Sequence, residues 1–252
     1  MTSKRTPRGI VSRDQWAAQI AALDEPPRKE PITAGRIVDA ALRLVEAEGY
    51  DALTMRRVAG VLQVSPGALY AHVRDKAELD DLMIAELCSR VRLPGPDPAQ
   101  WMAQVTDVCR QLRDQYLQYP GISRATMTAA PLSLDALRIN EGLLAILLAA
   151  GASPQDAAWA TDAAFLYIAA YSVVALRRHA DDADEQVDDK AEWIERFAML
   201  PADRFPVIRA HAAELTSGEG HDRFDATLGR LFGGLAPQPG GLAPQLEGHN
   251  EL

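Results

Sequence analysis

The sequence feature that most constrains the fold is the stretch from Thr54 to Lys76, which reads TMRRVAGVLQVSPGALYAHVRDK. Its first residue is a favoured N-cap, and the helical pattern that follows is interrupted at Gln63. A second cap, Ser65, precedes Pro66, which suits the first helical position because its missing N–H costs no hydrogen bond there. The stretch therefore predicts two short helices joined by a tight turn. Such a helix-turn-helix places its second helix in a DNA major groove.

Helix starts recur at short spacing around this stretch. A preceding helix is predicted over 32–49, with Thr33 as its N-cap and Gly49 as the residue with positive φ that ends it. Asp75 with Glu78 three residues later predicts a capping box at the start of the next helix. Because so many helix starts are specified within a short stretch, we expect the helices to be held at fixed angles to one another.

The net charge of −9 argues by itself against a nucleic-acid binder, but its distribution does not. Residues 1–76 hold 12 Lys and Arg against 9 Asp and Glu, whereas the remainder holds 14 against 26. A basic N-terminal third on an acidic body suits a DNA-binding head, although chance explains a surplus of this size equally well. Cys88 and Cys109 lack metal-type spacing and are interpreted as reduced thiols of a cytoplasmic protein.

The rest of the chain predicts an all-α fold with no membrane-spanning segment, since no uninterrupted run approaches about 18 apolar residues. The helix over 154–178 is apolar on most faces and is therefore expected to be buried on most faces. Other helices are expected over 12–23, 76–91, 99–119, 122–130, 133–150, 203–215 and 222–231, with a short one near 193–199.

These patterns divide the chain into four parts. We expect a basic arm and an extra N-terminal helix in 1–31, a DNA-binding domain in 32–76, a helical ligand-binding and dimerisation domain in 77–232, and a disordered tail in 233–252. The arm, with Lys4, Arg5 and Arg8, either lies along DNA or is an inert tail.

The run LTMRRVAGVLQVSPGALYAHVRDKAELDDLM resembles the DNA-binding head of the TetR family of bacterial one-component regulators. The matching marks lie roughly within residues 33–82, and Leu-Tyr-x-His-Val-x-x-Lys is the most specific of them. The resemblance implies an N-terminal three-helix helix-turn-helix domain followed by a larger helical bundle. It also implies a homodimer, a palindromic double-stranded DNA operator and release by a small-molecule inducer.

The resemblance and the residue chemistry together suggest roles within the head. Arg56 is the candidate for bidentate guanine recognition, while phosphate contacts position the head without reading sequence. The small residues that open the recognition helix suit close backbone approach and thymine methyls, and they depart from the family's commoner pattern. The alternative is that the arginines form only a solvated face. The predicted DNA-contacting residues are Thr54, Arg56, Arg57, Ser65, Pro66, Gly67, Ala68, Tyr70, His72 and Lys76.

For the body, the resemblance implies a ligand cavity lined by polar or aromatic residues on otherwise apolar helices. For each such residue taken singly, core or surface is the simpler interpretation. The predicted ligand-binding residues are Met102, Tyr116, Met127, Arg138, Tyr167 and Tyr171. Because the lining is mostly apolar, the expected inducer is uncharged or amphipathic, such as an antibiotic-like or polyketide-like molecule.

One enzymatic alternative comes from the acidic cluster at Asp181–Glu185, which resembles the magnesium-binding clusters of helical prenyl-transfer enzymes. Those enzymes carry a second carboxylate motif, which is missing here, and a solvated loop is the simpler interpretation. The histidines have no metal-ligand spacing, and no phosphate-binding loop or nucleophile elbow is present. The sequence therefore predicts no cofactor, no metal and no enzyme, but a ligand-responsive DNA-binding regulator, expected to be a repressor.

Overall fold

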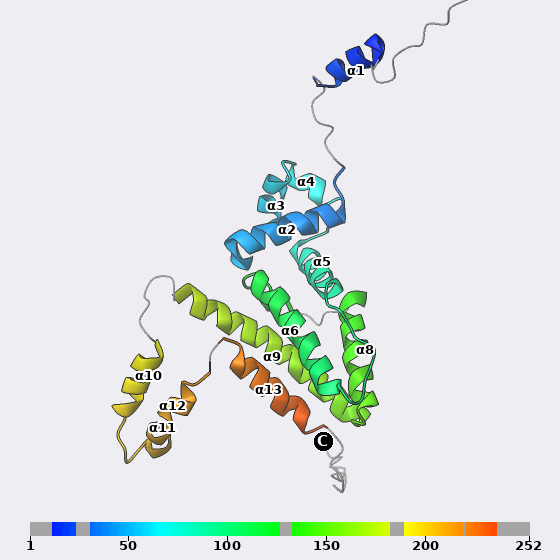
Figure 1. The fold of residues 1–252 in the computed structure, drawn as a ribbon. Coiled ribbons are helices and arrows are strands. Elements are labelled where there is room, and N and C mark those ends of the chain that lie inside the picture. Colours follow the sequence, from blue (N-terminus) through cyan, green and yellow to red (C-terminus); the bar gives the residue numbers. More distant parts are fainter. Residues whose placement is uncertain (1–11, 24–30, 127–132, 182–188, 219, 236–252) are drawn as a thin grey trace, which may run out of the picture. The chain divides into compact units, whose positions relative to one another are not determined.

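The computed structural model describes residues 12–23, 31–126, 133–181, 189–218 and 220–235 (Figure 1). All regular structure in these residues is helical, which confirms the all-α prediction. The chain forms two units, Met1–Thr33 and Ala34–Leu252. In the first unit, α1 (Arg13–Leu23) begins where Ser12 Oγ accepts a hydrogen bond from the Gln15 N–H, and its Trp16 and Ile20 are exposed.

The head of the second unit is a compact group of short helices. It comprises α2 (Ala34–Glu48), the 3₁₀ helix η1 (Tyr50–Ala52), α3 (Met55–Val61) and α4 (Pro66–Leu69). One face of α2 is buried, including Ile37, Ala41 and Val45, and α2 packs on η1, α3 and α5. Gly49 has φ +79°, as predicted for the residue that ends α2.

Helix α5 (Lys76–Ser89) connects the head to the body and packs on α2, α6, α7 and α8. Asp75 caps it through a bond from the Glu78 N–H, 2.9 Å long. The predicted capping box is only half formed, because the Glu78 carboxylate accepts from the Arg74 N–H and not from that of Asp75. The charge of Arg74 beside Glu78 accounts for this choice, since its guanidinium lies 3.2 Å from the same oxygen.

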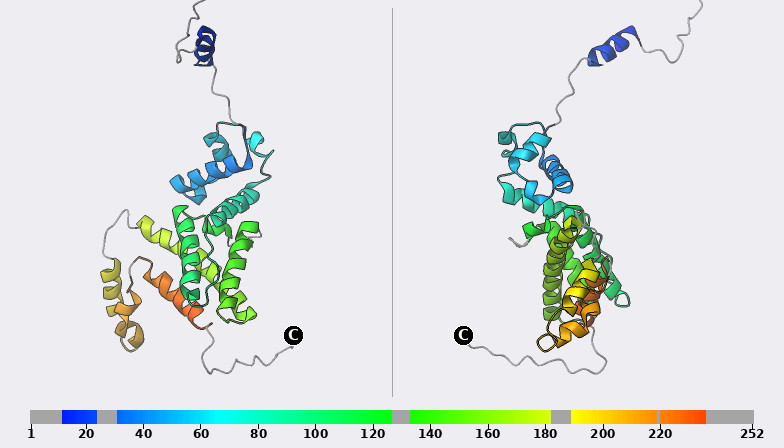
Figure 2. Two further views of the ribbon diagram at one scale, coloured as in Figure 1. Left: turned by 45° about the vertical axis from the view of Figure 1, so that its right-hand side comes forward. Right: turned by 90° about the vertical axis from the view of Figure 1, so that its left-hand side faces the viewer.

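The body is built from α6 (Trp101–Gln118), α7 (Ser123–Thr126), α8 (Leu134–Ala149), α9 (Pro154–Asp181) and α13 (Asp222–Gly233). Figure 2 shows α6 lying between α8 and α9, and α6 packs on both of them and on α13. Ser133 and Ser153 cap α8 and α9 through bonds from the N–H groups of Ala136 and Asp156. Of the helix predicted over 122–130, the described residues include α7, and residues 127–130 lie outside them.

Helix α9 differs from the prediction that it is buried on most faces. Trp159, Leu166 and Val174 are 60%, 60% and 48% exposed, whereas Ala157, Ala164 and Ile168 are fully buried. The difference arises because α6, α7, α8 and α13 cover only part of its circumference. By length and composition, Pro154–Ala175 is also apolar enough to cross a membrane. The sequence prediction missed this segment because it counted only uninterrupted apolar residues. Such a segment is weak evidence for a membrane span, since core helices of soluble proteins pass the same test.

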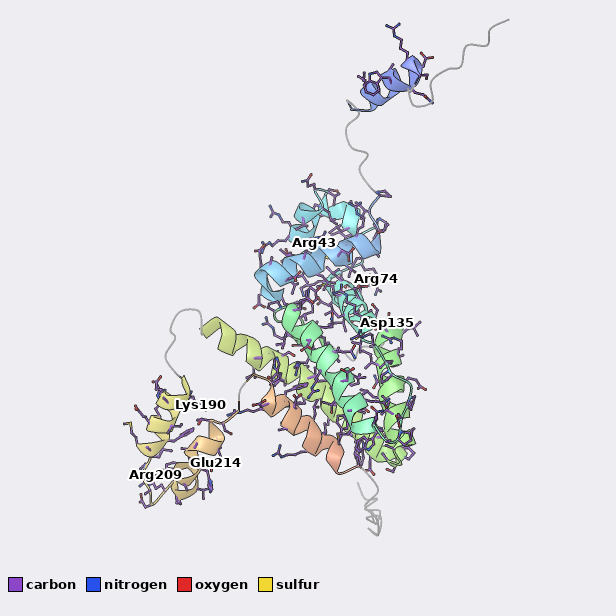
Figure 3. All side chains as sticks on the ribbon, viewed as in Figure 1. Arg43, Arg74, Asp135, Lys190, Arg209 and Glu214 are labelled. Atoms are coloured by element: carbon purple, nitrogen blue, oxygen red, sulfur yellow. The ribbon has the colours of Figure 1, made fainter. Side chains whose placement is uncertain are left out.

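Three short helices lie between α9 and α13 in the chain. They are α10 (Asp189–Ala198), α11 (Pro206–Ala210) and α12 (Ala212–Leu215), and their main contacts are with one another. The single helix predicted over 203–215 is wrong, because Pro206 starts a new helix and His211 interrupts it. Arg209, labelled in Figure 3, donates to the carbonyls of Ala198 and Leu200 and thereby joins α11 to the end of α10.

Candidate nucleic-acid interface and ligand cavity

The helix-turn-helix is held by caps and by a buried inner face. Thr54 Oγ1 accepts a hydrogen bond from the Arg57 N–H at the start of α3, whereas Ser65 makes no side-chain cap on α4. Between the helices, Gln63 has φ +55°, the one positive φ at a non-glycine among the described residues. The Val64 N–H then donates to the Ala59 carbonyl and closes the turn. Leu69 and Val73 are buried beneath this arrangement.

The predicted DNA-contacting residues lie on the opposite, outer face. Eight of them are exposed, and Ala68 and Lys76 are half-buried. The Arg56 guanidinium forms no hydrogen bond or ion pair with another described residue, which leaves its donors available. Arg57, by contrast, forms an ion pair with Glu48 at the end of α2. These two neighbouring arginines therefore have different surroundings: one is unpartnered and one fastens α3 to α2.

Lys76 is also held within the protein. Its Nζ lies 2.6 Å from Tyr50 Oη and 3.0 Å from an Asp80 carboxylate oxygen, and it sits 4.0 Å from the centre of the Tyr50 ring. Burial alone would lower the pKa of Lys76, but the hydrogen bonds with Tyr50 and Asp80 outweigh it and raise that pKa. The side chain remains 40% exposed and positively charged, so it is still accessible to an anion.

A cavity of about 400 Å³ lies in the body. Its walls come from five helices, α5 to α9, and include buried apolar side chains such as Leu112 and Ile139. The polar lining consists of Cys88, Tyr116, Thr126, Asn140 and Asp162. The volume lies within the range usual for small-molecule sites, as does the combination of apolar walls with a few polar groups.

Two of the polar groups in the cavity are held neutral. Burial raises the pKa of the Tyr116 hydroxyl, which is hydrogen bonded to Thr126. Burial also raises the pKa of the Cys88 thiol to about 12. Both groups therefore present neutral hydrogen-bonding atoms to the cavity and do not favour a charged ligand.

Of the six residues predicted to bind ligand, the cavity lining includes Tyr116. Met102 lines a separate shallow groove on α6, and Met127 lies outside the described residues. Arg138 faces the end of α5, where its Nη2 lies 2.9 Å from the Cys88 carbonyl oxygen and 2.8 Å from that of Val91. Arg138 itself is not a lining residue, although its neighbours on α8 are: Ala136, Leu137, Ile139 and Asn140.

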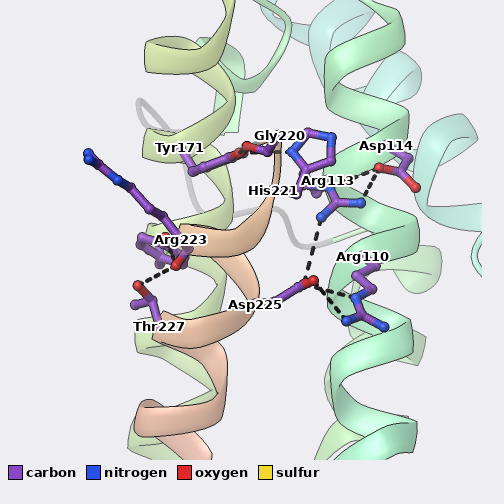
Figure 4. A network of polar contacts seen from close by, with 10 residues as sticks. Arg110, Arg113, Asp114, Tyr171, Gly220, His221, Arg223, Asp225 and Thr227 are labelled. Atoms are coloured by element: carbon purple, nitrogen blue, oxygen red, sulfur yellow. Dashed lines mark hydrogen bonds and ion pairs between the residues drawn. The ribbon is translucent and has the colours of Figure 1, made fainter. Parts of the chain in front are cut away.

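Tyr167 and Tyr171 lie on the side of α9 that faces α13. Their rings pack on Phe224 at 5.5 and 4.9 Å between centroids, and Tyr171 Oη lies 2.8 Å from His221 Nδ1. Figure 4 shows the surrounding network, in which Arg110 of α6 pairs with Asp225 of α13 at 2.8 Å. Arg110 lowers the pKa of Asp225 and keeps the ion pair charged. The two tyrosines thus belong to the α9–α13 packing.

The sequence reasoning missed Cys88, Thr126, Asn140 and Asp162 as cavity residues. A signal was present for the last two, since each is a polar residue within a strongly apolar helix. Thr126 carried no such signal, because its helix is only four residues long and its position depends on how the α6–α7 corner folds.

Comparison with known proteins identifies the family. The profile described as "Bacterial regulatory proteins, tetR family" matches residues 37–80, and that described as "Tetracyclin repressor-like, C-terminal domain" matches residues 93–238. The chain belongs to the TetR family of bacterial regulators, and it is a ligand-responsive DNA-binding transcriptional regulator. The comparisons give no support to the magnesium-enzyme alternative. Of its acidic cluster only Asp181, the last residue of α9, lies within the described residues.

Three relatives illustrate the similarity. The repressor DrrR1 of Streptomyces coeruleorubidus is 29% identical over 82% of this chain and 78% of its own length. The structure of ActR of Streptomyces coelicolor in complex with actinorhodin is 30% identical over 82% of this chain and 97% of its own, with a TM-score of 0.73. BioQ with its double-stranded DNA operator is 30% identical over 58% of this chain and 89% of its own, with a TM-score of 0.53.

Proposed function

We propose that the protein is a cytoplasmic repressor that binds a palindromic operator as a homodimer and leaves it when a small, largely apolar ligand enters the body. The observation that carries this proposal is the outer face of α3 and α4, where Arg56 is exposed and has no partner among the described residues, above a fully buried inner face. The same chain holds a cavity in the body, which supplies the ligand site. In this proposal residues 32–76 form the DNA-binding domain and 77–232 the ligand-binding and dimerisation domain.

Within the head, Arg56 reads a guanine through its two outer nitrogens. Ser65, Pro66, Gly67 and Ala68 are small, so they allow the backbone to approach the groove but supply few hydrogen bonds to base edges. The N-terminus of α3, behind Thr54, offers free N–H groups to a phosphate. Exposed Tyr70 and His72 and the charged Lys76 supply further phosphate contacts, and the basic segment at 1–11 remains a candidate for an additional one.

Arg57 has a different role in this scheme. Its ion pair with Glu48 keeps the exposed side chain against the end of α2, so a phosphate contact has to share it with that carboxylate. Recognition of the operator therefore depends on Arg56, on the shape of the groove and on the spacing between the two heads of the dimer.

The homodimer is formed through the exposed apolar side chains of α9. Trp159, Leu166 and Val174 are seven and eight residues apart and so lie along one face of the helix, and Leu166 also lines the cavity. Three large apolar residues exposed in a line are typical of a surface that another helix covers. A second copy is the partner that a palindromic operator requires, because two-fold symmetric DNA sites match two-fold symmetric proteins.

The ligand is a compact, mostly apolar molecule with a few hydrogen-bonding groups. The cavity walls are chiefly aliphatic, while Tyr116, Thr126 and Asn140 supply neutral donors and acceptors. The similarity to ActR, which has been solved with actinorhodin, favours an aromatic polyketide-like compound. Ligand binding tilts α5, which both lines the cavity at Cys88 and begins beside the head at Lys76.

Selection of binding sites from random double-stranded DNA tests the proposal. The expected result is a palindromic consensus with half-sites about one helical turn apart. The selected DNA is then titrated with the protein in the presence of actinorhodin and a panel of apolar and charged compounds. Release by apolar compounds supports the proposed ligand class, release only by charged compounds contradicts it, and failure to enrich any sequence contradicts the DNA-binding function itself.

A further inference from the structure

The head contacts the body at a second place besides α5. The Tyr50 N–H donates to the carbonyl oxygen of Pro120 at 2.8 Å, so η1 lies directly against the corner between α6 and α7. Beside this bond, Arg124 Nη2 lies 2.9 Å from the Asp51 carboxylate. A Cβ atom on Gly121, whose φ is +84°, would lie 3.2 Å from Tyr50 Cβ. The corner is therefore shaped to admit η1 at close range.

The other end of Tyr50 reaches the DNA-facing side of the head. Its hydroxyl donates to the Asp80 carboxylate at 2.7 Å and accepts from Lys76 Nζ at 2.6 Å. Lys76 Nζ also lies within hydrogen-bond distance of both Asp80 carboxylate oxygens, at 3.2 and 3.0 Å. The ammonium is still 40% exposed, so a phosphate can approach it from solvent. Tyr50 thus contacts the body through its backbone N–H, and through its hydroxyl it contacts Lys76, the residue proposed to bind a phosphate.

The same corner borders the ligand cavity. Thr126, at the end of α7, lines the cavity, and its Oγ1 donates to the Ser123 carbonyl at 2.7 Å. Ser123 is fully buried and its Oγ donates to the carbonyl of Ala169, another lining residue. The segment that holds η1 is therefore fixed on its other side by cavity residues of α7 and α9.

We infer that Tyr50 is a positioning residue for DNA binding, which holds the Lys76 ammonium for an operator phosphate and ties it to the α6–α7 corner of the body. This inference rests on the proposed function. It adds to the tilt of α5 a second connection between cavity and DNA, through Thr126, the corner and Tyr50. A shift of the corner moves Tyr50 and so weakens its hydrogen bond to Lys76, while the recognition helix itself stays unchanged.

A double-mutant cycle on the full-length protein tests the inference. Tyr50→Phe removes the hydroxyl but keeps the ring and the backbone bond to Pro120, and Lys76→Ala removes the ammonium. Affinity for the selected operator is measured by fluorescence anisotropy at several salt concentrations. Lys76→Ala is expected to weaken binding about tenfold and to reduce the salt slope by about 1. Tyr50→Phe is expected to weaken binding severalfold in the wild-type background and not at all in the Lys76→Ala background.

A second variant tests the body's part in the contact. Arg124→Ala breaks the ion pair with Asp51 and is expected to weaken operator binding about threefold, again only when Lys76 is present. Arg110→Ala, which breaks an ion pair of the body with Asp225, is the matched control and is expected to leave operator affinity unchanged. Tyr119→Phe, which removes a hydroxyl bonded to Arg90, is the control for Tyr50→Phe.

The outcomes separate this inference from the proposed function. Equal losses in both backgrounds, or no loss from Tyr50→Phe, would overturn the positioning role while leaving the regulator intact. A wild-type protein that selects no operator would instead contradict the proposed function. Melting temperatures of all variants are recorded, and because the cycle compares the same substitution in two backgrounds, a uniform loss of stability cannot produce the expected non-additivity.

Discussion

Arg138 Nη2 on α8 lies 2.9 Å from the carbonyl oxygen of Cys88 on α5, and it reaches the Ser89 and Val91 carbonyls as well. The last carbonyls of a helix lack partners within it, and they carry the negative end of its dipole. A guanidinium placed there supplies both hydrogen bonds and charge. The helix that enters the head is therefore fastened at its far end by a residue from the cavity wall helix α8.

Replacing Arg138 by Met is expected to lower the free energy of unfolding by about 1–3 kcal/mol, because three carbonyl oxygens lose a charged donor. Urea unfolding at a fixed protein concentration measures the change. Arg43→Met is the control, since Arg43 is exposed on α2 and is expected to change stability by less than about 0.5 kcal/mol. Equal stability of the two variants would show that the carbonyls at the end of α5 need no cap.

Arg56→Ala is expected to weaken operator binding by about 1–3 kcal/mol and to relax the preference at one base pair in each half-site. The physical reason is the loss of a bidentate contact from a side chain that has no partner in the part of the chain that the structure describes. Repeating the site selection with the variant measures both effects. A Lys at this position retains the charge but not the fork, so Arg56→Lys separates charge from base recognition. An unaltered consensus with Arg56→Ala would remove this residue from base readout.

Leu137→Trp is expected to fill part of the cavity, since Leu137 is one of its lining residues. Operator affinity without ligand should be unchanged. The concentration of compound needed to release the protein from DNA should rise at least about tenfold, because overpacking a site costs about 1–3 kcal/mol. Leu134→Trp is the control, since this 84% exposed residue lies on the same helix outside the cavity lining. If both variants respond to ligand like the wild type, the compound binds elsewhere.

Trp159→Glu is expected to convert the dimer to a monomer by placing a charge in the apolar face of α9. Sedimentation velocity measures the assembly state, and operator affinity should fall at least about tenfold because the two heads no longer bind together. Met199→Glu places the same charge on a residue that is 83% exposed between α10 and α11 and is not part of α9, and it serves as control. A Trp159→Glu protein that sediments as the wild type does would move the interface away from this stripe.

Much of the fold is readable in the sequence because its helix starts are specified locally. Thr54 caps α3 as its position predicts, and Gly49 has the positive φ expected of it. The outer face of the helix-turn-helix is equally readable, since burying Leu69 and Val73 leaves its polar neighbours outside.

The cavity is less readable, because five helices from Cys88 to Ala169 have to converge before a residue can line it. Arg138 shows the difficulty: a charged residue within an apolar helix favours either a ligand contact or a helix cap, and only the position of α5 decides between them. The exposed face of α9 has a related cause. Its apolar residues are alike in the sequence, and the number of neighbouring helices determines which of them remain uncovered.

Both cysteines are buried, and burial raises the pKa of the Cys88 and Cys109 thiols to about 12. At neutral pH almost none of either thiol is in the reactive thiolate form, and both are buried, although Cys88 also lines the cavity. A cysteine introduced on the exposed surface of α4 would therefore be the preferred site for a maleimide dye. The two native thiols therefore react little with such a dye. Fluorescence energy transfer between dyes on the two recognition helices would then report how each compound changes the distance between them.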